Sequence, residues 1–110
     1  MIPVGMPRKH KYGAKAVVID GIRFASKREG NRYAELKLLA KAGEINTLQL
    51  QHKYPVYLNG IKVLDYIADF VYFTKHGDYI VEDVKGVRTP VYRLKKKIIE
   101  AHYGIEIVEV

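Results

Sequence analysis

The sequence contains no cysteine, and this absence excludes two classes of feature. Without thiols the chain forms neither disulfides nor thiolate zinc sites, and nothing points to an oxidising compartment. No apolar run approaches the roughly 20 residues of a membrane span. Residues 1–7 lack the charged and apolar regions of a signal peptide. We therefore expect a cytoplasmic protein with no membrane partner.

Acidic residues are also few compared with basic ones. Twelve Asp and Glu stand against 19 Lys and Arg, which gives a net charge of +7 and a pI of about 9.6. Such a surplus favours a polyanionic partner, nucleic acid first and an anionic membrane surface second. The length of 110 residues fits one domain, and 48% hydrophobic residues supply one modest core.

The first 15 residues form a segment of their own, because prolines and glycines alternate there with basic side chains. We expect a flexible basic arm over residues 1–15 and a single domain over residues 16–110. The arm is either a frayed solvated terminus or an arm that follows DNA through Lys9, Lys11 and Lys15.

Turn and capping signals divide the domain into elements. We expect a hairpin around Asp20-Gly21, a helix over 27–42 capped by Ser26, a strand from 45 that Pro55 interrupts, a turn at Asn59-Gly60, a strand over 61–73, a loop at 76–78, a strand over 79–84, a helix over 90–103 and a strand over 105–110. This order, α-β-β-β-α-β after the hairpin, predicts an α/β fold with a mixed central β-sheet flanked by two helices.

Apolar spacing predicts which face each helix buries. The first helix would bury Tyr33, Leu36, Leu39 and Ala40, and the second Val91, Leu94, Ile98 and Ala101. Basic side chains would lie on or beside the outer face of the second helix. Among them, Arg88, Arg93 and Lys96, with Lys27 on the first helix, are the side chains expected to contact a phosphate backbone.

The hairpin formed by the strands over 61–73 and 79–84 carries the chemistry. The 76–78 loop predicts that Asp69 lies opposite Lys85 and that Val71 lies opposite Asp83. Because side chains alternate along a strand, Asp69, Asp83 and Lys85 then share one face and Glu82 points away. Apolar residues on both faces of the incoming strand indicate a central strand, where a charge needs a partner or a metal.

Two neighbouring carboxylates suit a hard divalent cation such as Mg²⁺, and a nearby lysine can orient water or stabilise a phosphoryl group. The simpler alternative is a solvated hairpin with a cross-strand ion pair. Gln51 is either an exposed strand residue or a side chain that leans over this face. Glu29 is either the capping-box glutamate of the first helix or a third acidic group at the site.

In this order, the residues resemble the PD-(D/E)XK nuclease superfamily. The pattern is a helix glutamate, a strand aspartate and an Asp-x-Lys motif on the next strand, here Glu29, Asp69 and Asp83-Val84-Lys85. The usual proline before the first aspartate is Ala68, and residue 30 is glycine where a helix former is expected. The resemblance is closer to small phage-type proteins of unknown function assigned to that superfamily. It rests on residues 11–15, 20–29, 43–45, 50–51, 66–70 and 81–86.

The resemblance implies a metal-dependent endodeoxyribonuclease. Asp69 and Asp83 would bind Mg²⁺ or Mn²⁺ with the carbonyl of Val84, Lys85 would position the attacking water, and Glu29 would complete the site; Gln51 joins them as a catalytic candidate. Relatives in the superfamily include Holliday-junction resolvases of DNA recombination. We therefore expect a structure-selective enzyme that acts on branched DNA as a homodimer, in the host cytoplasm if the gene is phage-borne.

Two other functions fit the same sequence. The chain could be a nucleic-acid-binding or recombination accessory module without catalysis, since its basic charge and nine tyrosines suit binding. It could also cut RNA, because nothing in the sequence reads a 2′-hydroxyl.

Overall fold

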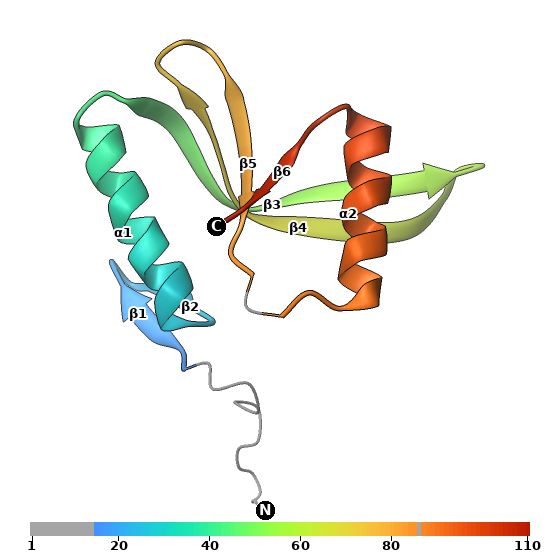
Figure 1. Cartoon of the computed structure of the whole chain (residues 1–110), viewed down its shortest axis with the longest axis horizontal. Helices are drawn as coiled ribbons and strands as arrows, with labels where there is room; N and C mark the ends of the chain where they lie inside the picture. The colour runs from blue at the N-terminus through green and yellow to red at the C-terminus, as the bar shows by residue number, and fades with distance from the viewer. Residues whose placement is uncertain (1–14, 86) are drawn as a thin grey trace, which may run out of the picture. The chain divides into compact units, whose positions relative to one another are not determined.

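The computed structural model describes residues 15–85 and 87–110 (Figure 1). The chain divides into two compact units, Met1–Leu38 and Leu39–Val110. The boundary falls within helix α1, Lys27–Lys41. Of the predicted basic arm, only Lys15 is among the described residues; Lys9 and Lys11 lie outside them.

The first unit contains the predicted small hairpin and most of α1. Strands β1, Val17–Ile19, and β2, Ile22–Phe24, pair antiparallel. Asp20 and Gly21 both have positive φ, at 55° and 76°, as a two-residue hairpin turn requires. The helix begins after Ser26, whose Oγ accepts the backbone N–H of Glu29 at 3.1 Å. The predicted turn and N-cap are confirmed.

Gly30 allows α1 to approach β1 closely. A Cβ at this position would lie 2.7 Å from Val17 Cγ2 and 3.0 Å from Ile19 Cδ1. Glycine therefore replaces a better helix former for steric reasons, although it costs the helix up to about 1 kcal/mol. The predicted apolar stripe is only half right, because Tyr33 and Leu36 are buried whereas Leu39 is 37% exposed.

The second unit is built on a four-stranded mixed sheet. Strands β3 (Ile45–Leu58), β4 (Ile61–Thr74), β5 (Tyr79–Asp83) and β6 (Ile107–Glu109) are ordered β3-β4-β5-β6. Neighbouring strands are antiparallel except β5 and β6, which are parallel and joined through α2, Pro90–Tyr103. The mixed α/β class and the order of elements are confirmed.

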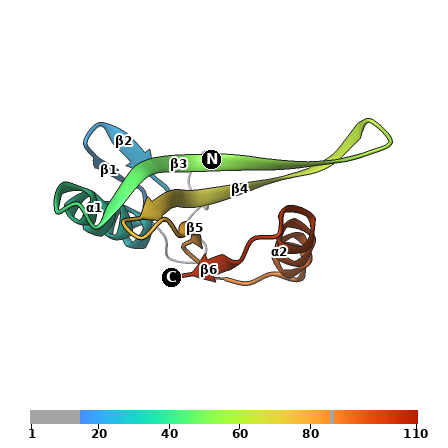
Figure 2. The ribbon, with the colours of Figure 1, turned by 90° about the horizontal axis from the view of Figure 1, so that it is seen from above.

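The β3–β4 hairpin projects beyond the rest of the sheet (Figure 2), since β5 pairs only with residues 70–73 of β4. Asn59 and Gly60 form its predicted turn, with φ of 52° and 78°. The prediction that Pro55 interrupts the strand is wrong. Because β3 is an edge strand, it tolerates a residue without an N–H, and the pairing continues through Pro55 opposite Asp65.

The predicted register of the β4–β5 hairpin is wrong by two residues. Val71 pairs with Val81, not Asp83, and by the same register Asp69 falls opposite Asp83, not Lys85. The loop comprises residues 75–77, because Thr74 N–H donates to the carbonyl of Asp78 at 2.8 Å and the third loop residue, Gly77, has φ of 90°. An even shift keeps each side chain on its predicted face.

Helix α2 has the predicted ends but not the predicted buried face. Thr89 caps it by accepting the Tyr92 N–H at 3.1 Å, and Gly104 ends it in the left-handed conformation. Val91 and Leu94 are 65% and 59% exposed, and Ala101 is exposed as well. Of the predicted residues only Ile98 packs against the core, beside the buried Tyr92 and Ile99. The buried face of α2 is rotated from the predicted one, because a tyrosine whose hydroxyl has a hydrogen-bond partner can be buried just as an aliphatic residue can.

The core of the second unit lies between α2 and the sheet. Its buried members are Tyr54, Val56, Tyr66, Ala68, Val71, Val81, Tyr92, Ile99 and Ile107. Buried tyrosines donate their hydroxyls to acidic side chains, Tyr72 to Glu82 on one face and Tyr66 to Asp83 on the other. These tyrosines are structural rather than available for stacking on bases. No helix in the described part of the chain is long and apolar enough to cross a membrane.

Candidate active site

Asp69, Asp83 and Lys85 meet at the end of β5, within the second unit. Asp83 is the last residue of the strand and its side chain is 4% exposed. Asp69 comes from β4 and hydrogen-bonds with the Asp83 carboxyl group. Lys85 follows two residues later and places its Nζ 3.4 Å from Asp83 Oδ1. Two carboxyl groups and one ammonium group thus converge on a single point.

The backbone and a glutamine hold Asp69 in place. Its Oδ2 accepts the backbone N–H of Val84 at 2.8 Å, and its Oδ1 lies 3.4 Å from Gln51 Nε2. Gln51 has a positive φ of 55°, which is uncommon for a residue with a side chain and is often found at functional sites. Gln51 therefore contacts Asp69. This agrees with the predicted alternative in which its side chain leans over the acidic face.

The environment of Asp83 disfavours its charge. Burial, followed by the hydrogen bond with Asp69, raises the pKa of Asp83 to about 6, although the Tyr66 hydroxyl and Lys85 act in the opposite direction. Burial, followed by its own hydrogen bond to Asp83, raises the pKa of Tyr66, so its phenol remains a donor. A carboxyl pair of this kind loses its mutual repulsion when a cation binds between the two groups.

Lys85 rests on the ring of Tyr92. Its Nζ lies 4.2 Å from the ring centroid, within the range of a cation–π contact. The Tyr92 hydroxyl donates to Glu109 Oε2 at 2.8 Å, and Glu109 also pairs with Arg88 at 2.6 Å. The position of Lys85 is therefore fixed by side chains from helix α2 and strand β6.

Sequence reasoning missed Tyr66 and Tyr92 as members of the site. Both tyrosines stand among apolar residues, where an aromatic side chain is ordinary core. Spacing gave no signal for Tyr66, because it precedes Asp69 by three residues and strict alternation along a strand would put the two side chains on opposite faces. A phenol near two strand carboxylates is a natural partner for a buried acid.

Glu29 belongs to the first unit, where it is 8% exposed. Its role at the site therefore stays a prediction. Among residues 15–85 and 87–110, no three His, Asp or Glu side chains gather in a metal-binding group. Asp69 and Asp83 with the Val84 carbonyl nevertheless fit Mg²⁺, which commonly takes one or two carboxylates and keeps several waters.

The basic residues predicted to contact DNA differ in how exposed their charges are. Lys15, Lys27 and Arg93 are exposed. Arg88 is held by Glu109, and Lys96 pairs with Glu100 at 3.2 Å. The last two therefore already have carboxylate partners within the chain.

Comparison with known proteins gives a family without a described activity. Neither the curated proteins nor the solved structures contain a match to this chain. One family model, described as a protein of unknown function (DUF1064), matches residues 9–108, a range that includes Asp69, Asp83 and Lys85. The chain belongs to the DUF1064 family.

Proposed function

We propose that this protein is a metal-dependent endonuclease of the PD-(D/E)XK type that hydrolyses DNA phosphodiester bonds. The observation that carries the proposal is the meeting of Asp69, Asp83 and Lys85 at the end of β5. The same three residues form the motif that the sequence shares with that superfamily. The net charge of +7 supports a polyanionic substrate.

Asp69 and Asp83 would hold Mg²⁺ or Mn²⁺, together with the Val84 carbonyl. When bound, such an ion stabilises the charge that develops on the phosphoryl oxygens. The chain keeps the two carboxylates ready for it, because the Val84 N–H orients Asp69 and the Tyr66 hydroxyl orients Asp83.

Lys85 would position the attacking water through its Nζ. Asp83 and the ring of Tyr92 hold that ammonium group from two sides, which leaves its remaining N–H bonds for water or a phosphoryl oxygen. The water oxygen attacks phosphorus in line and releases a proton to solvent, the opposite P–O bond breaks, and the leaving sugar oxygen takes up a proton from solvent. Prior positioning of the water lowers the entropic part of the barrier.

The proposed substrate is branched DNA, such as a Holliday junction, cut by a homodimer. Two symmetric cuts require two sites, and a C₂ dimer supplies them. Exposed apolar side chains support self-association: Leu94 on α2 is 59% exposed, and Leu58 and Ile61 at the β3–β4 tip are 61% and 67% exposed. The cytoplasm is the proposed compartment.

The test is cleavage of labelled DNAs with Mg²⁺, Mn²⁺ or EDTA. The panel holds linear duplex, single strand, flap, fork, four-way junction and an RNA strand. Asp83→Ala should abolish cleavage, whereas Asp78→Ala, an exposed aspartate of the β4–β5 turn, should leave it unchanged. Cleavage that survives Asp83→Ala, or that EDTA does not stop, would refute the assignment.

The second candidate is a nucleic-acid-binding accessory module with no catalysis. It is favoured by the lack, among the described residues, of a third acidic or histidine side chain in a metal-binding group. In that case wild type binds DNA with strong salt dependence but cuts no member of the panel with either metal.

A further inference from the structure

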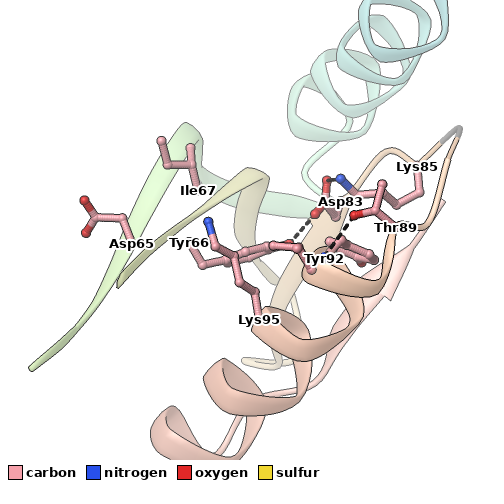
Figure 3. A pocket seen from close by; sticks show the side chains of 9 residues that line it. Asp65, Tyr66, Ile67, Asp83, Lys85, Thr89, Tyr92 and Lys95 are labelled. Atoms are coloured by element: carbon pink, nitrogen blue, oxygen red, sulfur yellow. Dashed lines mark hydrogen bonds and ion pairs between the residues drawn. The ribbon is translucent and has the colours of Figure 1, made fainter. Parts of the chain in front are cut away.

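A cleft of about 340 Å³ leads away from the acidic site. Figure 3 shows Asp83 and Lys85 at one end, with β4 on one side and the first turns of α2 on the other. Tyr66 reaches from β4 toward Asp83, and Lys95 reaches from α2 across the cleft toward β4. The cleft is therefore continuous with the proposed catalytic residues and carries one lysine of its own.

Lys95 has an unusual position among the basic residues of α2. It lines the cleft and is half-buried, whereas Lys97 is exposed and Lys96 pairs with Glu100 at 3.2 Å. Within the described part of the chain, no carboxylate lies at ion-pair distance from Lys95. A positive charge held in a cleft without an ion-pair partner is available to an anionic ligand.

The other charge along this wall does not cancel Lys95. Asp65 also lines the cleft, but its Oδ2 pairs with Lys62 at 2.9 Å, and its carboxylate is turned away from Asp83 (Figure 3). Lys53 and Lys95 also interact electrostatically with Asp65, so three lysines share this one carboxylate. Beyond the two catalytic aspartates, the charge beside the cleft is therefore net positive.

The remaining walls are apolar, with Ile67 on β4 and Val91 on α2. Both side chains are substantially exposed, at 47% and 65%. A lysine between two apolar surfaces matches the repeating chemistry of a nucleic-acid strand, in which phosphates alternate with sugars and bases. A small anion would use the lysine but not these walls.

We propose that this cleft seats the substrate strand, with one phosphate at Asp69, Asp83 and Lys85 and a neighbouring phosphate on Lys95. This inference rests on the proposed function, because that function supplies the strand. It adds a binding residue that the sequence pattern placed on the outer face of α2. It also sets the path of the strand, between β4 and α2.

The test is binding of a fluorescent oligothymidylate and of a mixed-sequence duplex, measured by anisotropy across a salt series. Ca²⁺ replaces Mg²⁺ as a hard cation for the same oxygen ligands, and a denaturing gel confirms that the DNA remains intact. The variants are Lys95→Gln, Lys95→Arg and Lys97→Gln. Lys97→Gln is the matched control, because it removes the same charge from the exposed part of the same helix.

Lys95→Gln should weaken binding roughly five-fold at low salt and reduce the salt slope by about one. Lys95→Arg should restore both, and Lys97→Gln should change neither by more than about two-fold. Equal effects of Lys95→Gln and Lys97→Gln would overturn the inference, and so would a wild type that binds neither DNA. Binding that depends on Lys95 without cleavage in Mg²⁺ would uphold the cleft and refute only the nuclease.

Discussion

Replacing Asp83 with asparagine should stabilise the metal-free protein at neutral pH. The pKa of Asp83 is raised from 3.8 to about 6, chiefly by burial and then by Asp69. The folded state therefore binds a proton more tightly than the unfolded state does. The stability that this proton contributes is complete below pH 3.8 and is lost as the pH rises through 6. Asparagine resembles the protonated acid, so the variant does not undergo this loss.

The size of the effect follows from the two pKa values. At about 1.4 kcal/mol for each pKa unit, the gap between 3.8 and 6 amounts to about 3 kcal/mol at pH 7. At pH 4 the same two values leave a difference of only about 0.5 kcal/mol. No reduction for solvent screening applies, because the Asp83 side chain is 4% exposed.

Urea denaturation in EDTA, followed by circular dichroism at pH 4 and pH 7, measures this difference. Asp83→Asn should be more stable than wild type by about 3 kcal/mol at pH 7 and nearly equal to it at pH 4. Asp78→Asn, at an exposed position, should match wild type at both values. A free-energy difference that is the same at both pH values would refute the reasoning, as would a variant that is less stable at pH 7.

Three further predictions concern other parts of the chain. Tyr66→Phe removes a hydrogen-bond donor that lowers the pKa of Asp83, so the acidic limb of the pH–rate profile should move to higher pH. The unfolding free energy should fall by about 1–3 kcal/mol. An acidic limb that stays in place would contradict the contact between Tyr66 and Asp83. Gly30→Ala should lower the unfolding free energy, measured by thermal denaturation, by about 1–3 kcal/mol, because Val17 lies close to this position. Adding Val17→Ala to the same chain should recover part of that loss. If the free-energy changes of the two substitutions simply add, the clash is excluded. Leu94→Glu should convert the dimer to a monomer in sedimentation velocity. The unfolding midpoint should not fall, since Leu94 is 59% exposed. A dimer that persists in this variant would show that α2 is not part of the interface.

Local signals were sufficient for most of the fold. Asp20-Gly21 and Asn59-Gly60 set their turns because the backbone of a two-residue hairpin demands positive φ. Thr89, Pro90 and Gly104 set the ends of α2 for equally local reasons. Signals of this kind depend only on neighbouring residues, so the sequence carries them in full.

Predictions that depended on distant partners were less successful. Pro55 breaks a strand only if that strand has neighbours on both sides, and the edge position of β3 depends on the whole sheet. The buried face of α2 depends on Tyr92, whose hydroxyl donates a hydrogen bond to Glu109 on β6. The acidic pair survived a register error because the shift was an even number of residues and so kept Asp69 on the face of Asp83.

The features that support the site were beyond sequence pattern for the same reason. Lys85 is positioned by Tyr92 from a helix that begins only after the strand has ended. The different surroundings of Lys95 and Lys96 depend on the rotation of α2 against the sheet. Sequence spacing alone does not distinguish Lys95 from Lys96 as the residue that binds a phosphate.

Cleavage of a labelled four-way junction in Mg²⁺, by wild type and by Asp83→Ala, tests the central claim most directly. The account predicts paired symmetric cuts by wild type, their loss in EDTA and in Asp83→Ala, and their persistence in Asp78→Ala. Binding of the junction by wild type with no cut in Mg²⁺ or Mn²⁺ would contradict the claim that the meeting of Asp69, Asp83 and Lys85 is a catalytic centre.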